Sequence, residues 1–204
     1  MDKLSKYKSM RERSKTPEPF TSKDIDPKKL VFVVQKHQAT ALHYDFRLEA
    51  SKVMLSWAVP KGPTLDSKVR RLAMQTEDHP LDYRHFEGII PKGEYGAGPV
   101  IIWDRGTYLP EIEISKSVRK QITNKSDGEK IMEEGIKKGE IKFFLKGKKI
   151  NGSFALVKIK GWSGRDNSWL LVKHQDQYSK EGFEAKDFPK SVVSGKTLDQ
   201  INPK

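Results

Sequence analysis

The chain contains 204 residues, of which 35% are hydrophobic and 32% are charged, a composition that suits one folded domain or two small ones. Cysteine is absent, which excludes disulfide bonds, thiolate zinc sites and a catalytic cysteine. Lys and Arg outnumber Asp and Glu by 39 to 27, a net charge of +12. This surplus favours a polyanionic partner such as nucleic acid, or less often an acidic membrane surface.

Residues 1–29 are predicted to form a basic N-terminal arm. Lysine and arginine alternate here with Ser and Thr, and Pro17, Pro19 and Pro27 prevent any helix beyond a short first one. The arm either remains a disordered tail or folds over a site or a nucleic acid. It lacks the apolar segment of a secretory signal, and no apolar run in the chain approaches the ~20 residues of a membrane helix.

Residues 30–175 are predicted to form a single β domain. Blocks rich in Val, Ile and aromatic residues are separated by Gly, Pro, Asn and Asp, which indicates strands joined by turns. The expected strands are 30–35, 42–48, 53–60, 71–76, 99–104, 141–145, 153–160 and 169–173. This pattern favours a mainly β fold, a small closed or nearly closed antiparallel β-barrel of about eight strands with one or two short helices.

Helical signals are confined to a few places. The segment 128–138 has an apolar stripe at helical spacing, with Asp127 as a candidate N-cap and Gly139 as a candidate C-cap. Residues 111–127 are weakly patterned and are predicted to be a loop or a second short helix. Beyond the last strand the composition turns polar, so residues 176–204 are predicted to be a polar C-terminal tail.

The strand 42–48 carries two chemically different faces. Because side chains alternate along a strand, His43, Asp45 and Arg47 share one face, and the face behind it is apolar. His37 ends the preceding strand and could return across the turn as a third metal ligand. Two imidazoles and a carboxylate suit Mn, Fe, Zn or Ni better than Mg or Ca. Arg47 beside the metal would offer a planar fork to a phosphate or a carboxylate.

A second polar cluster lies in residues 76–104. His79 follows an expected strand and is a candidate acid or phosphate contact, because histidine titrates near neutral pH. The simpler interpretation is that His79 caps a turn and that Tyr83 packs in the core. For the first cluster the simpler interpretation is a surface salt-bridge group, but His37 and this second cluster favour the metal site. The Gly-rich segment 93–98 lacks the Gly-Lys-Ser/Thr of a P-loop and is predicted to be a tight turn.

The remaining signals are weaker. The tryptophans at positions 57, 103, 162 and 169 are expected in the core, with base stacking as the lesser alternative. His174 is predicted to lie on the surface. Residues 137–173 carry ten Lys or Arg against two acidic residues, which is either a solvated face or a track for a phosphate backbone.

These motifs are similar to those of a known family. The blocks 32–49, 55–63, 77–108, 143–158 and 169–174 resemble the 3′-phosphoesterase module of bacterial ATP-dependent DNA ligase D, which also occurs in stand-alone form. The resemblance implies a small β-barrel and a Mn²⁺-dependent site. It also implies healing of DNA 3′ ends: removal of a 3′-terminal ribonucleoside, then of the resulting 3′-phosphate, to leave a 3′-OH for repair and end joining.

The resemblance assigns roles to individual residues. It implies that His37, His43 and Asp45 bind Mn²⁺, and Co²⁺, Zn²⁺ or Ni²⁺ could occupy the same site. It places Arg47 and His79 on the scissile phosphate. Tyr83 would lie beside that phosphate as a further catalytic residue, and the residues expected to support substrate binding are Arg11, Glu18, Gln35, Lys61 and Arg71.

The arm departs from the family pattern. Arg11 and Glu18 match it, but Glu12 stands where Asp is usual and Arg13 where Phe is usual. The partners implied are DNA or DNA/RNA primer-template 3′ ends, a Ku-like protein and a DNA ligase. We expect a monomer that is cytoplasmic and nucleoid-associated, with no membrane partner.

Two other functions compete with this one. A non-haem Fe(II) oxygenase would use His43, Asp45 and a distant His79 or His174, with an arginine holding a keto acid. It leaves His37 unexplained. A non-catalytic basic β-barrel that binds nucleic acid would explain the net charge and the aromatic residues, but not the face that carries His, Asp and Arg.

Overall fold

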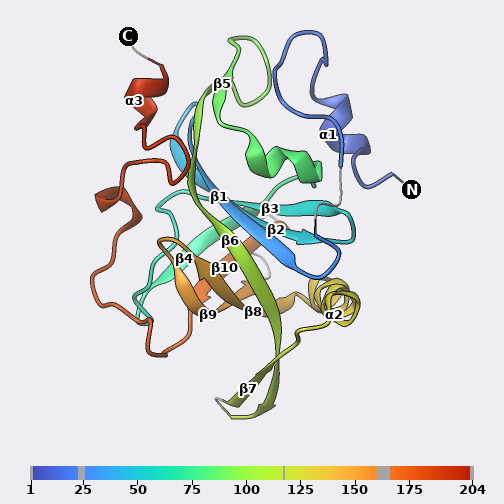
Figure 1. Cartoon of the computed structure of the whole chain (residues 1–204), viewed down its shortest axis with the longest axis vertical. Helices are drawn as coiled ribbons and strands as arrows, with labels where there is room; N and C mark the ends of the chain where they lie inside the picture. Colours follow the sequence, from blue (N-terminus) through green and yellow to red (C-terminus); the bar gives the residue numbers. More distant parts are fainter. Residues whose placement is uncertain (1, 23–25, 117, 160–165, 203–204) are drawn as a thin grey trace.

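A computed structural model describes residues 2–22, 26–116, 118–159 and 166–202. Strands dominate these residues (Figure 1). The strands are β1 (Leu30–Gln38), β2 (Leu42–Ala50), β3 (Val53–Val59), β4 (Arg70–Gln75), β5 (Gly88–Ile90), β6 (Gly98–Ser115), β7 (Val118–Gln121), β8 (Glu140–Gly147), β9 (Asn151–Lys158) and β10 (Ser168–Lys173). The helices are α1 (Ser5–Ser9), α2 (Lys125–Lys138) and α3 (Leu198–Ile201), with 3-10 helices η1 (Leu81–His85) and η3 (Ala185–Asp187). Within the described residues, no helix is both long and apolar enough to cross a membrane.

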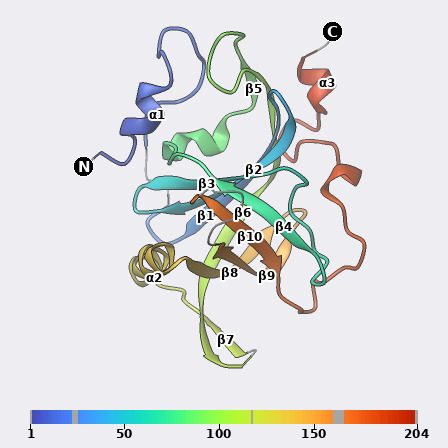
Figure 2. The same ribbon diagram turned by 180° about the vertical axis from the view of Figure 1, so that it is seen from behind.

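Eight strands close into a barrel in the order β1-β2-β3-β4-β10-β9-β8-β6, and the pairing of β1 with β6 completes the ring. Every pairing around the ring is antiparallel. The predicted small antiparallel barrel is therefore confirmed. Strands β5 and β7 pair with opposite ends of the long β6, and the β6–β7 hairpin projects beyond the barrel (Figure 2).

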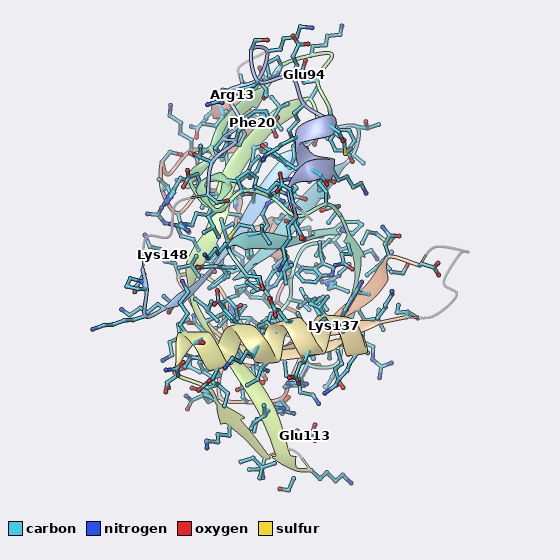
Figure 3. All side chains as sticks on the ribbon, turned by 90° about the vertical axis from the view of Figure 1, so that its right-hand side faces the viewer. Arg13, Phe20, Glu94, Glu113, Lys137 and Lys148 are labelled. Atoms are coloured by element: carbon cyan, nitrogen blue, oxygen red, sulfur yellow. The ribbon has the colours of Figure 1, made fainter. Side chains whose placement is uncertain are left out.

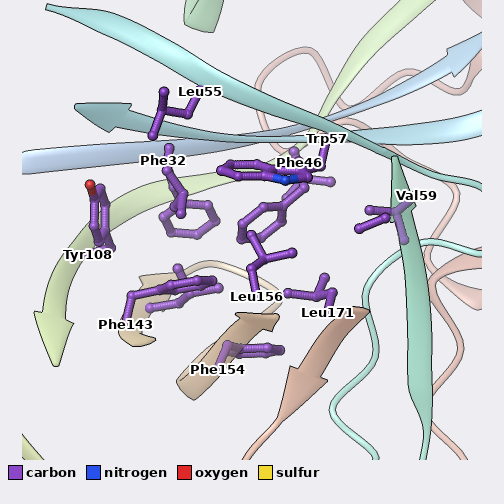
Figure 4. Packing of buried hydrophobic residues seen from close by; sticks show 14 of the residues in the cluster. Phe32, Phe46, Leu55, Trp57, Val59, Tyr108, Phe143, Phe154, Leu156 and Leu171 are labelled. Atoms are coloured by element: carbon purple, nitrogen blue, oxygen red, sulfur yellow. The ribbon is translucent and has the colours of Figure 1, made fainter. Parts of the chain in front are cut away.

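Aromatic and aliphatic side chains fill the barrel (Figure 4). The rings of Phe143 and Phe154 stack at 6.3 Å, and Trp57 meets Trp169 edge to face at 5.8 Å. Such pairs add to the stabilisation that burial of the rings already provides. The buried tryptophans are Trp57, Trp103 and Trp169, as predicted, and Trp162 lies outside the described residues.

A second layer covers the outer face of β1, β2 and β3. Leu81 of η1 packs there with Val33 and Met54, which point away from the barrel interior. Helix α1 adds Tyr7, whose ring contacts that of Tyr83 in η1. The polar side chains on the outer face of β1 and β2 are therefore enclosed between the barrel wall and this layer.

Two local predictions need correction. Helix α2 begins at Lys125, because the side chain of Asn124 accepts a hydrogen bond from the Asp127 backbone N–H at 3.1 Å and so acts as the N-cap. Gly139 does end the helix, in the left-handed conformation at φ 82°. Residues 111–127 were expected to be a loop or a short helix, but they complete β6 and form β7 and the first turn of α2.

The segment after β10 is anchored at several points. The indole N–H of Trp103 donates a hydrogen bond to the Phe188 carbonyl at 2.7 Å, and the rings of Phe183 and Phe188 stack at 4.9 Å. Ala185 is fully buried. Although its composition is polar, this segment packs along the barrel as far as α3 (Figure 1).

Candidate metal and phosphate site

The β1–β2 hairpin brings the three predicted metal ligands together. His37 lies directly opposite His43 in the antiparallel register, and Asp45 follows two residues later on the same face. One donor atom from each of His37, His43 and Asp45 lies within 4.8 Å of the others. Elsewhere in the described residues, no group of three or more His, Asp or Glu side chains has this spacing.

Backbone carbonyls orient the two imidazoles. His37 Nε2 lies 2.7 Å from the Gly96 carbonyl and His43 Nδ1 lies 2.9 Å from the Ala41 carbonyl. Because a carbonyl only accepts, these nitrogens carry the protons. The other nitrogens, His37 Nδ1 and His43 Nε2, lie 3.5 and 3.6 Å from the Asp45 carboxylate. Metal-binding histidines adopt this arrangement, so the donor set could hold a divalent transition metal.

The electrostatics of Asp45 also favour a cation. Burial by itself raises the pKa of the Asp45 carboxyl, but Arg47 and the two imidazoles outweigh burial and hold that pKa well below its usual value. Asp45 is therefore a carboxylate at neutral pH. Burial lowers the pKa of His43, but the hydrogen bond to Asp45, the charge of that carboxylate and the bond to the Ala41 carbonyl together outweigh burial, so the pKa of His43 is raised.

Arg47 is held rigidly beside this group. Its Nη2 forms an ion pair with Asp45 Oδ2 at 3.2 Å, its Nε donates to Gln35 Oε1 at 2.8 Å and its Nη1 donates to Ser56 Oγ at 2.7 Å. Gln35 is fully buried and donates to the carbonyls of Tyr83 and Phe86. Gln35 therefore positions Arg47 rather than lining the cavity. Guanidinium N–H groups that remain are available to an anion.

His79 is linked to Arg47 through Ser56, whose Oγ lies 2.7 Å from Arg47 Nη1 and 3.3 Å from His79 Nδ1. Its Nδ1 lies 2.8 Å from the Glu77 carbonyl, so Nδ1 carries the proton and Nε2 is left as an acceptor. Nε2 lies 3.5 Å from Arg11 Nη2. Burial and the charges of Arg47 and Arg11 hold the pKa of His79 well below its usual value. The imidazole is therefore neutral in the free protein.

The arm closes over these residues. Arg11 donates to Glu18 at 2.8 Å and to Glu77 at 3.1 Å, and both pairs are almost fully buried. Glu18 also accepts the Tyr83 hydroxyl hydrogen bond at 2.8 Å. The arm is thus folded over the site, the second of its two predicted states. The side chains of Glu12 and Arg13, where the chain departs from the family pattern, are exposed and are not part of these buried contacts.

The cluster opens onto a cavity of about 430 Å³. Predicted residues that line it are Arg11, His37, His43, Asp45, Arg47, His79 and Tyr83. Four predicted residues do not join them. Glu18 and Gln35 bond to the lining residues Arg11 and Arg47 without lining the cavity themselves. Lys61 is exposed in the turn after β3, and Arg71 on β4 pairs with Glu184 at 2.7 Å. Lys61 and Arg71 therefore do not line this cavity, and their expected support of substrate stays a prediction.

Sequence reasoning missed several residues of the site. Glu77 pairs with Arg11, and its position two residues before His79 in extended backbone was the available signal. Tyr7 lies under the Arg11 guanidinium at 4.0 Å, and nothing in the arm's composition marked it. Ser56 and Gly96, which hold Arg47 and His37, were also unmarked.

His174 lies apart from this site. Its Nδ1 lies 2.9 Å from Ser153 Oγ on β9, and it is absent from the cavity lining. It is half-buried, whereas a surface position was predicted. An oxygenase centre that combines His43 and Asp45 with His174 is therefore not formed.

Comparison with known proteins identifies the relatives of this chain. Residues 35–158 match the DNA ligase D 3′-phosphoesterase domain. The multifunctional non-homologous end joining protein LigD of Pseudomonas aeruginosa is 43% identical over 203 residues, which covers 96% of this chain and 22% of the relative. The multifunctional non-homologous end joining DNA repair protein LigD of Mycobacterium tuberculosis is 42% identical over 184 residues, 90% of this chain and 21% of the relative.

The match includes the end of β1, all of β2 and β3 and the segment from η1 through β6, which carry the three candidate metal ligands, Arg47 and His79, whereas the arm precedes it. The chain spans about a fifth of the length of these relatives. On these matches, the chain belongs to the DNA ligase D 3′-phosphoesterase domain family.

Proposed function

We propose that this protein is a metal-dependent 3′-phosphoesterase that prepares DNA ends for non-homologous end joining. It removes a 3′-terminal ribonucleoside and then the 3′-phosphate, leaving a 3′-OH. The observation that carries the proposal is the convergence of His37, His43 and Asp45 in one cavity with Arg47 and His79. Family membership and the end-joining relatives support the substrate class.

His37 Nδ1, His43 Nε2 and the Asp45 carboxylate would hold the metal, with Mn²⁺ as the proposed ion and Co²⁺, Zn²⁺ or Ni²⁺ as substitutes. When bound, the metal supplies Lewis-acid polarisation of a phosphoryl oxygen and orientation of a water. Gly96 and Ala41 keep the two imidazoles in the tautomers that this role requires.

The charged side chains of the cavity act on the phosphate. Arg47, fixed by Gln35 and Ser56, binds phosphate oxygens with its free N–H groups and stabilises their charge in the transition state. Because it is already ordered, Arg47 loses little side-chain entropy when the substrate binds. Arg11 brings a second guanidinium to the same cavity from the arm.

His79 is proposed to transfer a proton at Nε2. The imidazole is neutral in the free protein, because burial and two guanidiniums disfavour its charge. A phosphate bound between the guanidiniums and the imidazole offsets both effects, so its negative charge raises the pKa of His79 toward a value useful for a general acid. The leaving oxygen would receive this proton.

A gel assay tests the proposal. A 5′-labelled DNA strand ending in one ribonucleotide is annealed to a longer template and incubated with the protein and MnCl₂, with EDTA, or with the Asp45→Ala variant. We expect shortening to a 3′-phosphate end and then to a 3′-OH end with MnCl₂ alone. Retention of the strand by the protein without cleavage in any condition would instead support a non-catalytic binding module.

In the cell we propose DNA or DNA/RNA primer-template 3′ ends as substrates, with a Ku-like protein and a DNA ligase as partners. The relatives are named for non-homologous end joining, which motivates these partners. A cytoplasmic, nucleoid-associated monomer fits this role.

A further inference from the structure

The cavity contains an exposed aromatic ring that the proposed chemistry does not use. Tyr95 lines the cavity together with the metal and phosphate residues, yet it is 50% exposed. Tyr83, which also lines the cavity, is 2% exposed and has its hydroxyl bonded to Glu18. An accessible aromatic ring beside a phosphate site is the kind of surface on which nucleobases stack.

Tyr95 is carried by a loop with a defined shape, the Gly-rich segment that joins β5 to β6. Two turns form the loop, with hydrogen bonds from the Glu94 N–H to the Pro91 carbonyl and from the Ala97 N–H to the Glu94 carbonyl. Gly96 and Gly98 adopt φ of 77° and 141°, and a side chain at position 98 would clash with the Gln38 carbonyl. The backbone therefore fixes where Tyr95 is presented.

The loop contacts both the candidate metal ligands and the N-terminal arm. Its Gly96 carbonyl accepts the His37 hydrogen bond, and its Glu94 carboxylate accepts one from the Glu12 N–H of the arm at 3.4 Å. Figure 3 shows Glu94 and Arg13 of the arm at the same end of the molecule. Tyr95 is thus one residue away from the group that orients a candidate metal ligand.

Arg11 fixes the surroundings of the Tyr95 ring. The Arg11 guanidinium carbon lies 4.0 Å from the Tyr7 ring centre and 5.4 Å from the Tyr95 ring centre. Tyr7 is completely buried under this cation, whereas Tyr95 remains accessible. A cation at this distance attracts the ring and keeps it beside the phosphate-binding guanidiniums. The adjacent apolar lining comes from Ala41, Leu42, Ala58, Pro60 and Ile90.

We propose that Tyr95 is a stacking platform for an unpaired nucleobase of a nucleotide that flanks the bound phosphate. This inference rests on the proposed function, because it takes the cavity as a phosphate site. The base could belong to the departing 3′-terminal nucleoside or to the nucleotide that stays on the strand. In either case the protein would select ends whose last base is unpaired from the template, since a paired base cannot lie on the ring.

Fluorescence of 2-aminopurine tests the inference directly. Strands carry 2-aminopurine at the 3′-terminal or the penultimate position and are mixed with the full chain in EDTA, so that binding is measured without turnover. We expect quenching of one of the two positions by the wild type and by Tyr95→Phe, and loss of quenching with Tyr95→Ala. Affinity should fall roughly 5- to 150-fold in Tyr95→Ala, the range of one base–aromatic stack. The quenched position identifies which base is bound.

Matched controls separate stacking from other roles. Ile89→Ala removes an exposed side chain of the neighbouring strand β5 that is not in the cavity lining, and should leave quenching unchanged. Mn²⁺ affinity of Tyr95→Ala should equal that of the wild type, which shows that Gly96 still orients His37. Equal binding and quenching by Tyr95→Ala would overturn the inference, as would an equal loss in Tyr95→Phe, which would indicate a hydroxyl hydrogen bond.

Turnover distinguishes this inference from the proposed function. If the wild type quenches in a Tyr95-dependent way but never cleaves in MnCl₂, the stacking platform stands and the esterase proposal fails. If the wild type cleaves and Tyr95→Ala binds and cleaves equally well, only the stacking platform fails. Absence of DNA binding by the wild type would overturn both.

Discussion

At the scale of single residues, hydrogen bonds to backbone carbonyls define the chemistry of the site. Gly96 and Ala41 each take one imidazole proton, which leaves His37 Nδ1 and His43 Nε2 facing the Asp45 carboxylate. Alternation along β2 predicted that His43 and Asp45 share a face. It did not predict the contact between His37 and the Gly96 carbonyl, because Gly96 lies in a loop 59 residues further along the sequence.

Removing a ligand should have a different effect from removing His79. His43→Ala takes away one of three donors, so we expect loss of Mn²⁺ binding and of activity. His79→Ala leaves the three donors intact, so Mn²⁺ affinity should be preserved while the rate falls about 10²–10⁴-fold, the usual contribution of a general acid. Calorimetric titration of Mn²⁺ into both variants checks this, and loss of metal in His79→Ala would contradict the assignment.

His174 predicts a dependence of stability on pH. Burial, followed by the charges of Arg119 and Lys142, lowers the pKa of His174 to about 4, against an ordinary value of 6.5. The unfolded chain therefore binds a proton at a pH where the folded protein does not, so stability falls as pH drops from about 6.5 to 4. The expected loss is about 1–3 kcal/mol.

Urea unfolding of the wild type and His174→Gln at pH 7 and pH 4.5 measures how much His174 contributes to the loss of stability at low pH. Glutamine keeps a donor for Ser153 Oγ but does not titrate. Contributions from other groups, including buried His79, are common to both proteins and cancel in the difference. An equal loss of stability in the two proteins at pH 4.5 would show that His174 is not responsible.

At the scale of elements, the N-terminal arm shows how burial changes the value of a charge pair. Arg11–Glu18 is almost completely buried, while Glu12–Lys15 in the same arm is more than half exposed. Breaking a buried pair leaves an uncompensated charge and typically costs 3–5 kcal/mol, whereas exposed pairs are worth about 0–1 kcal/mol. The arm's charge pattern in the sequence could not distinguish these two pairs.

Glu18→Gln should therefore release the arm, and Glu12→Gln should not. The expected result for Glu18→Gln is faster amide exchange in residues 2–22 at unchanged exchange in the barrel strands, with a loss of phosphoesterase activity. Hydrogen exchange followed by mass spectrometry measures both regions at once. If the amides of the arm in Glu18→Gln were as protected from exchange as in the wild type, the buried Arg11–Glu18 pair would not be what holds the arm.

Two other elements show where pattern reading fails. In the part of β6 that extends beyond the barrel, the charged residue Glu111 is buried, while the apolar residues Ile112 and Ile114 are exposed. Glu113 is exposed as well, so burial does not follow the alternation of Ile and Glu, and this segment showed no strand with an apolar buried face. Glu111 is tolerated inside because its carboxylate accepts a hydrogen bond from the Ser153 hydroxyl at 2.5 Å. For α2, Asn124 and Asp127 are both good caps, and the choice between them depends on packing of the first turn.

At the scale of the whole molecule, the two faces of the wall formed by β1, β2 and β3 are both covered by other parts of the protein. Its inner face packs into the main core, and its outer face carries the polar site beneath η1 and the arm. The barrel itself was predictable, because short apolar strands with little helix have few other architectures. Closure by β1 and β6 was not, since their pairing joins segments far apart in the sequence. Part of the basic surplus is also neutralised locally, because Lys142 pairs with Glu113 and Lys173 with Asp176.

The division between inner and outer faces can be tested on neighbouring phenylalanines of β8. Phe143 is fully buried among Phe46, Tyr108 and Phe154, and Phe144 is only partly buried. Phe143→Ala should lower the free energy of unfolding by about 3–5 kcal/mol, and Phe144→Ala by clearly less. Urea denaturation measures both, and equal losses would contradict the placement of the core.

The central claim is that His37, His43 and Asp45 form the metal centre of the enzyme. Crystals grown with MnCl₂ and measured on both sides of the manganese absorption edge test it most directly. We predict one strong anomalous peak bounded by His37 Nδ1, His43 Nε2 and the Asp45 carboxylate, absent from Asp45→Ala crystals. A manganese peak elsewhere in the cavity, or bound through the other imidazole nitrogens, would contradict it.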